Sequence, residues 1–195
     1  MMPAISAFAV AYPAIELDLD FTDRMVDVIE EGFDAVIRTG NATDSQLMMR
    51  RLGTFPYVVA GAPDYFARRG NPAEPEDLLG HACLHHRWSA SGKLERWRLS
   101  RDGEELDLQL PVTAVANTME PLIELAERGV GLAYVPLFWV RRRIAAGTIA
   151  TTLDRFTPQV GNFHILWPAG RQRSPKVKAF VDFMAQTLFA EPAGG

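Results

Sequence analysis

The stretch NTMEPLIELAERGVGLAYVPLFW, residues 117–139, decides the fold. It opens with an Asn-Thr pair, which are residue types that cap helices, and apolar side chains then recur at helical spacing. Two glycines end that helix, and the run 130–135 is almost continuously apolar, as in a strand covered on both faces. A second helix follows the proline at 136. The stretch therefore predicts a helix–strand–helix part of an open, layered α/β sheet.

This arrangement places two short segments where ligands gather in such sheets: Asn117–Met119, which includes Thr118, and Val135–Pro136. Ligands bind outside the carboxyl ends of strands and at helix N-termini, where unpaired N–H groups and the helix dipole attract anions. We expect these residues to form one wall of a binding site. Ordinary α/β packing behind a good helix cap is the alternative.

Composition is that of a soluble globular chain. Its 195 residues are enough for one large or two small domains, and the formal net charge of −4 argues against a general nucleic-acid surface. The single cysteine excludes an internal disulfide and fits a reducing compartment. No apolar run reaches about 18 residues and the N-terminus lacks a basic signal-peptide region, so we expect a cytoplasmic protein without membrane contact.

The rest of the chain alternates between helical and extended patterns. IELDLDF at residues 15–21 alternates apolar and acidic side chains, which predicts a half-buried edge strand. Thr22 or Asp23 then caps a helix that ends at Gly32. An Asp-Gly pair at 102–103 predicts a hairpin between the alternating runs 94–100 and 106–110. Further strands are expected at 33–37, 46–52, 55–60, 81–86, 112–116, 148–153 and 162–167, and further helices at 5–12, 63–69, 75–79, 137–146 and 175–188.

This order is typical of two α/β lobes joined by two extended crossings. A doubly wound half-domain normally opens with a strand, so the first lobe begins one element late. We interpret the chain as a fragment, or as a protein that has lost its start.

Catalytic motifs are lacking: we find neither a G-x-S-x-G elbow nor a phosphate-binding loop. Cys83 and His85 share one strand face, yet a buried thiol beside a partly exposed histidine explains them better than a catalytic or metal site. The sequence therefore indicates no enzyme, no metal and no cofactor.

Two further pairs of side chains suit ligand binding. His86 and Trp88 follow a strand end and could contact a small ligand at a cleft rim, or simply cover a hinge. Arg38 and Thr39 follow another strand, where a guanidinium and a hydroxyl could hold a carboxylate. A surface ion pair of Arg38 is the alternative.

Five segments, in this order and spacing, resemble the effector-binding domain of LysR-type transcriptional regulators. They are EGFDAVIRTG (31–40), RRLG (50–53), ACLHHR (82–87), ANTMEPLIELAERGVGLAYVPLFWV (116–140) and SPKVKAFVDFM (174–184). Each is weak alone, but in this order and spacing they are strong, and the resemblance spans most of the chain, from about Tyr12 to Ala185.

The resemblance implies a two-lobe, periplasmic-binding-protein-like (type II) α/β fold. Three-layer αβα lobes would be joined by two crossover strands, with lobe I at residues 1–57 plus 163–195, lobe II at 58–162, and the first strand of lobe I missing. It also implies a small effector, often an anion, held between the lobes. The family's pocket positions fall on Thr22, Arg38, Thr39, His86, Trp88, Asn117, Thr118, Val135 and Pro136. Glu120, in the first helical turn, works against an anion there.

Partners are implied in the same way. Regulators of this kind form homodimers through these domains, or tetramers in the full-length protein, and bind DNA through an N-terminal winged helix-turn-helix that nothing here matches. The apolar first helix and the acidic edge at 16–20 fit such a dimer contact. A solute-binding protein or an enzyme of the same two-lobe architecture is the alternative function.

Overall fold

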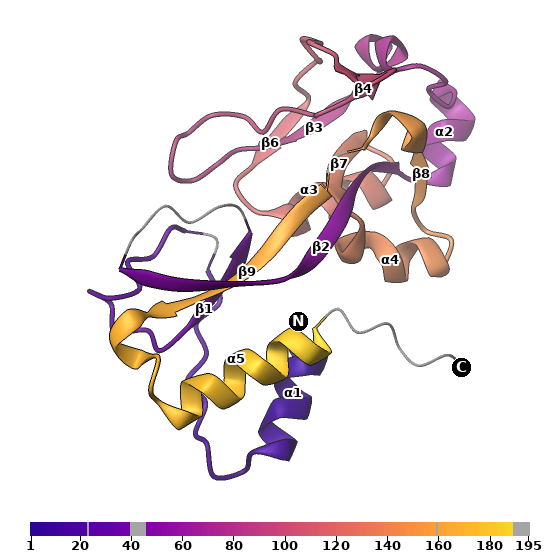
Figure 1. Cartoon of the computed structure of the whole chain (residues 1–195). Helices are drawn as coiled ribbons and strands as arrows, with labels where there is room; N and C mark the ends of the chain where they lie inside the picture. The colour runs from indigo at the N-terminus through magenta and orange to yellow at the C-terminus, as the bar shows by residue number, and fades with distance from the viewer. Residues whose placement is uncertain (23, 40–45, 159, 189–195) are drawn as a thin grey trace. The chain divides into compact units, whose positions relative to one another are not determined.

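The computed structural model describes residues 1–22, 24–39, 46–158 and 160–188 (Figure 1). Its contacts divide into two compact units. Unit 1 comprises Met1–Thr22, Val26–Thr54 and Gly161–Gly195, and unit 2 comprises Asp23–Met25 and Phe55–Val160. The chain is thus a mixed α/β protein in which strand β2 (Leu47–Gly61) begins in one unit and ends in the other.

Unit 1 contains a short sheet and two packed helices. Its strands follow the order β1 (Val36–Thr39), β9 (Val160–Pro168), β2, and β1 runs antiparallel to β9. Helix α1 (Met2–Ala11) lies beside α5 (Pro175–Thr187), after the short η3 (Ala169–Arg171) (Figure 1). Phe8 of α1 is fully buried, with its ring 5.1 Å from that of Phe180 and 5.4 Å from that of Phe183. This aromatic contact is the centre of the helix pair.

Unit 2 is built on the end of β2. Strands β7 (Leu132–Pro136) and β8 (Ala150–Thr152) both pair antiparallel with β2, and β7, β3 (Cys83–His86) and β6 (Ala114–Ala116) follow in parallel. Helix α3 (Met119–Glu127) packs on one face through Leu122, Ile123 and Ala126. The remaining elements are α2 (Pro63–Arg69), η1 (Pro75–Gly80), β4 (Ser100–Arg101), β5 (Glu104–Glu105), α4 (Leu137–Ala145) and η2 (Asp154–Phe156).

The stretch that decides the fold forms as predicted. It gives α3, β7 and α4 in that order, and all five residues of β7 are buried. Gly129 has a φ of 72°, which ends α3 in a left-handed conformation that glycine adopts without strain. Gly131 is needed for a different reason. A Cβ at this position would lie 2.5 Å from the carbonyl oxygen of Ala82, so only glycine lets β7 approach that backbone.

The predicted strand at residues 15–21 is wrong. This segment is irregular, and Leu19 and Phe21 are 43% and 64% exposed. An alternating pattern specifies two faces, but a strand also needs a neighbour that pairs with its backbone. No strand of the described residues pairs with this segment, so the alternating pattern alone does not produce a strand.

The predicted helix that ends at Gly32 is also wrong: residues 28–32 form turns only. The Asp27 carboxylate accepts hydrogen bonds from the backbone N–H groups of Ile29 and Glu30, at 3.0 and 2.9 Å. Such local bonds compete with helix formation. Val28 is buried, while Met25 and Ile29 are exposed. Asp23, one of the two predicted caps, lies outside the described residues.

Several boundaries differ from the prediction. The runs 46–52 and 55–60 form one uninterrupted strand, β2, because Gly53 and Thr54 continue the extended backbone. The strand predicted at 33–37 lies three residues later, as β1, so Arg38 and Thr39 belong to the strand itself. The predicted hairpin forms, with the Asp102–Gly103 turn at positive φ, but each of its strands has only two residues.

Candidate functional site

The start of α3 is the part of the candidate site that the structure of unit 2 defines most clearly. Thr118 is the N-cap residue, as its position predicts, but its side chain makes no capping hydrogen bond. Asn117 is exposed, Thr118 is half-buried, and within the described ranges neither side chain has a hydrogen-bond partner. The first turn therefore keeps unpaired N–H groups together with an unused amide and hydroxyl, a combination that suits an anion.

Glu120 lies in the same first turn, and its charge opposes an anion. The structure neutralises it, because Arg143 of α4 donates from Nη2 to Glu120 Oε1 at 2.7 Å. The same guanidinium donates from Nε to Glu127 Oε2 at 2.8 Å, and Glu127 also accepts from the Thr148 hydroxyl. That hydroxyl and Arg143 lower the pKa of the Glu127 carboxyl. This network weakens the objection that Glu120 raises.

Val135 and Pro136 close β7 behind this helix start. Val135 is fully buried, and its side chain belongs to the core cluster that α3 covers. Pro136 is buried too and is the N-cap residue of α4. Because both side chains are buried, what these residues can contribute to the candidate site is the position of the backbone at the end of β7.

His86 joins the start of α3 to the loop that carries Trp88. The His86 ring lies with Nε2 3.3 Å from the carbonyl oxygen of Asn117 and its centroid 4.8 Å from that of Trp88, edge to face. His86 is 8% exposed, whereas Trp88 is 42% exposed. The structure thus brings together three of the site residues predicted from the sequence: Asn117, His86 and Trp88. The His86 imidazole is the most buried of the three.

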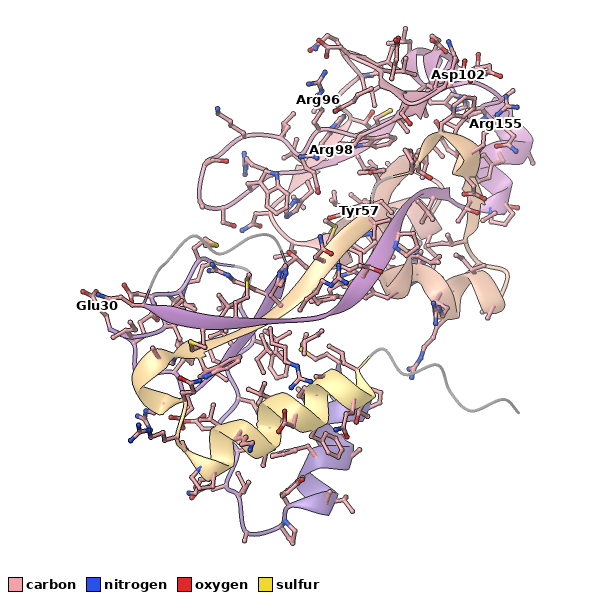
Figure 2. All side chains as sticks on the ribbon, in the orientation of Figure 1. Glu30, Tyr57, Arg96, Arg98, Asp102 and Arg155 are labelled. Carbon is pink, nitrogen blue, oxygen red and sulfur yellow. The ribbon has the colours of Figure 1, made fainter. Side chains whose placement is uncertain are left out.

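Glu95 is a member of this cluster that the sequence analysis missed. Its backbone N–H donates to His86 O at 2.7 Å, and its carboxylate lies 3.1 Å from His86 Nδ1. Burial, together with the negative charge of the nearby Glu95 carboxylate, raises the pKa of Tyr57, which is labelled in Figure 2. The alternation in ERWRL at 95–99 was a usable signal, because it puts Glu95 on the same side as the buried Trp97 and Leu99.

In unit 1 the predicted site residues are Thr22, Arg38 and Thr39. Arg38 and Thr39 lie in β1 opposite His164 and Phe163 of β9. Neighbouring residues of a strand point to opposite faces, so the guanidinium and the hydroxyl leave the sheet on different sides. Thr22 is exposed on the irregular segment.

The Cys83–His85 pair has structural roles. The Cys83 thiol is fully buried, and burial raises its pKa to about 12, which disfavours the reactive thiolate. The prediction that His85 is partly exposed is wrong: it is 6% exposed and its Nε2 lies 2.9 Å from the carbonyl oxygen of Pro111. Across the part of the chain that the structure describes, no three histidine, cysteine or acidic side chains gather as metal ligands.

A hollow of about 900 Å³ lies elsewhere on unit 2, between the β4–β5 hairpin and η2. Figure 2 labels three of its lining residues, Arg98, Asp102 and Arg155. Its arginines are largely engaged, since Arg101 pairs with Glu74 and Glu76, and Arg155 also pairs with Glu74. None of the ligand-binding residues predicted from the sequence lines this hollow.

Comparison with known proteins gives one consistent family. The family model described as the LysR substrate binding domain matches residues 1–188. The HTH-type transcriptional regulator PgrR of Escherichia coli is 33% identical over 93% of this chain and 61% of its own length. The HTH-type transcriptional activator AaeR of E. coli is 34% identical over 74% of this chain and 46% of its own. The chain therefore spans about three fifths, or less, of these relatives.

Solved structures agree with this result. The regulatory domain of CrgA, a LysR-type transcriptional regulator from Neisseria meningitidis, superposes with a TM-score of 0.84 at 27% identity, covering 95% of this chain and 90% of that domain. The regulatory domain of AphB from Vibrio vulnificus gives a TM-score of 0.75 at 24% identity, covering 94% and 90%. At that identity the likeness to AphB concerns the fold alone. No helix of the described residues is long and apolar enough to span a membrane.

Proposed function

The chain belongs to the LysR substrate binding domain family, and we propose that it senses a small anionic effector through a site that includes the start of α3. The periplasmic-binding-protein-like α/β fold, predicted from the sequence, is shared with the CrgA regulatory domain. The relatives named above are transcriptional regulators. The role proposed for this chain is therefore control of transcription rather than catalysis.

One observation carries the proposal: α3 begins with unpaired backbone N–H groups and two unused polar side chains. Asn117 and Thr118 can donate to a carboxylate where the helix dipole already favours negative charge. Arg143 removes the main obstacle by pairing with Glu120. Trp88, 42% exposed beside His86, offers an aromatic face to the organic part of an effector.

The remaining residues complete the proposed site. Lobe II, proposed as residues 58–162, contributes Asn117, Thr118, Trp88, His86, Val135 and Pro136, of which the last three act mainly by shaping the site. Lobe I, proposed as residues 1–57 plus 163–195, contributes Thr22, Arg38 and Thr39, with the Arg38 guanidinium as a second group for a carboxylate. We propose that the effector lies between the two lobes and that its binding shifts their equilibrium arrangement.

The wider role follows the family. In a LysR-type regulator the sensing domain acts together with a DNA-binding part, and we propose that this chain supplies the sensing part in a cytoplasmic homodimer. A solute-binding or enzymatic role is less well supported, because the relatives carry regulator names and the buried Cys83 thiol suits no nucleophilic chemistry.

The experiment is a melting-temperature screen of the 195-residue chain with aromatic and aliphatic carboxylic acids. At about 100 times its dissociation constant, a binding acid adds roughly 2.7 kcal/mol to the free energy of unfolding. For a chain of this size we expect an increase in Tm of about 5 °C or more. A broad panel of acids that leaves the Tm unchanged contradicts the proposal.

The site is then located with two variants. Thr118→Ala should weaken binding of the active acid about tenfold, because it removes a hydrogen-bond donor to a charged group. Thr113→Ala is the matched control, since Thr113 is an exposed threonine of the same unit outside the proposed site. Equal losses in the two variants place the acid elsewhere.

A further inference from the structure

Two ionisable side chains are buried side by side in unit 2. His86 and Glu95 are each 8% exposed, and His86 Nδ1 lies 3.1 Å from Glu95 Oε2. A glutamate is rarely buried to this degree without a partner. The protonation state of each member of the pair therefore has to be explained. The two atoms are close enough for an ion pair but are not aligned for a hydrogen bond, and both are buried without any other hydrogen-bond partner among the described residues.

The contact of the other ring nitrogen, His86 Nε2, shows that this nitrogen carries a proton. His86 Nε2 lies 3.3 Å from the carbonyl oxygen of Asn117, and a carbonyl only accepts, so Nε2 carries a hydrogen. A neutral imidazole would then present a bare lone pair at Nδ1, directly against a carboxylate oxygen. Two acceptors buried at this separation repel each other and leave both unsatisfied.

The groups around the pair leave the imidazole as the partner of the Glu95 carboxylate. Burial and the negative charge of that carboxylate raise the pKa of the nearby Tyr57. Tyr134 and Arg98 are the other titratable or charged groups that act on this cluster, and the Tyr134 ring stacks on Tyr57 with the centroids 4.8 Å apart. The neighbouring His85 points to the opposite strand face, toward Pro111 and Trp97. A proton on Nδ1 therefore satisfies both buried atoms after a small ring rotation.

We infer that Glu95 is a positioning residue that holds His86 protonated on both nitrogens, and that its contact with His86 Nδ1 fixes the start of α3 and the Trp88 loop. The inference rests on the proposed function for its relevance to ligand binding. His86 is the point where three segments meet: its carbonyl accepts from Glu95, its Nε2 donates to Asn117, and its ring packs against Trp88. Glu95 acts on the site through this histidine and does not itself contact the effector.

The first test is nitrogen-15 NMR of the imidazole side chains in the unliganded 195-residue chain at neutral pH, with His86 assigned by His86→Gln. Both His86 nitrogens should show the shift of an N–H group in the wild type. Glu95→Gln should change only Nδ1, because its amide can donate to a neutral ring that keeps the hydrogen on Nε2. A bare Nδ1 in the wild type overturns the inference.

The second test separates positioning from general stability. We expect Glu95→Ala to speed amide hydrogen exchange in the first turn of α3 by about tenfold, and Glu95→Gln to restore wild-type exchange. Exchange in the α1–α5 helix pair, measured in the same samples, should stay unchanged. Unchanged exchange at the start of α3 in Glu95→Ala, or failure of Glu95→Gln to restore it, contradicts the inference.

Both tests are made without an effector, so they fail independently of the proposed function. If no acid raises the melting temperature but the NMR and exchange results are as expected, the proposed function is wrong and the role of Glu95 stands. If an acid raises the melting temperature but His86 Nδ1 is bare, the proposed function stands and the inference about Glu95 is wrong.

Discussion

The two units differ in how closely their structures follow the local sequence pattern. In unit 2 the apolar run at 130–135 becomes β7, which pairs with β2 on one side and β3 on the other. In unit 1 the equally regular pattern at 15–21 forms no strand, and its apolar side chains Leu19 and Phe21 remain exposed. The difference shows that periodicity specifies which face of a segment is apolar, whereas neighbouring backbone decides whether a strand forms.

The largest effect is expected from Phe8 of α1, whose ring packs against Phe180 and Phe183. Phe8→Ala removes a fully buried ring between Phe180 and Phe183 and should lower the free energy of unfolding by about 4 kcal/mol. Urea denaturation followed by segment-resolved hydrogen exchange measures the loss and locates it in unit 1. A loss below about 1 kcal/mol would mean that α1 contributes little to the fold.

A slightly smaller effect is expected in unit 2 from Gly131→Ala. The new Cβ would lie 2.5 Å from the Ala82 carbonyl oxygen, which is backbone and cannot move aside, so we expect a loss of about 3 kcal/mol. Gly80→Ala is the control, because nothing lies within 4 Å of its added Cβ and its φ is not positive. Similar stability of both variants in urea would show that β7 does not depend on this close approach.

An intermediate effect concerns pH and belongs to unit 2. The Thr148 hydroxyl and Arg143 hold the Glu127 pKa below its ordinary value of 4.5. A carboxyl whose pKa is lowered by folding stabilises the fold above the unfolded pKa, and this stabilisation is lost as pH falls through the lower folded value. Glu127→Gln should therefore cost up to about 1 kcal/mol at pH 7 and less at pH 3. Urea midpoints at the two pH values test this, and an equal loss at both contradicts it.

The smallest effect is the one that most directly tests the contrast between the units. Phe21 is 64% exposed on the unpaired segment, so Phe21→Ser should change the free energy of unfolding by no more than about 0.5 kcal/mol. Phe8→Ala, in the same unit, is the matched comparison. A loss of about 2 kcal/mol or more for Phe21→Ser would mean that the segment is packed after all.

The sequence specified most of unit 2 and the helix pair of unit 1, because glycine, proline and capping positions mark their ends. Gly70, Gly129 and Gly147 all have positive φ at the helix ends where the pattern predicts them. The predicted helix before Gly32 failed because the Asp27 side chain occupies the backbone N–H groups that a helix would use. That competition depends on side-chain geometry rather than on the spacing of apolar residues.

For the candidate site, residue types at strand ends and helix starts indicated His86, Trp88, Asn117 and Thr118, which the structure brings together or leaves next to one another in unit 2. The pattern could not show that Glu95 returns to His86, because the eight residues of the intervening loop separate them and the contact depends on how that loop folds back. Nor could it show that Arg143, from the next helix, neutralises Glu120.

The β4–β5 hairpin has a consequence for engineering. Its strands are two residues long, and its turn, Asp102–Gly103, is exposed. Exposed turns of this kind tolerate inserted domains well, because few backbone hydrogen bonds are lost. A fluorescent protein inserted after Asp102 would sit on the same unit as the start of α3 without replacing any of its residues, which is a design for a genetically encoded biosensor of the proposed effector.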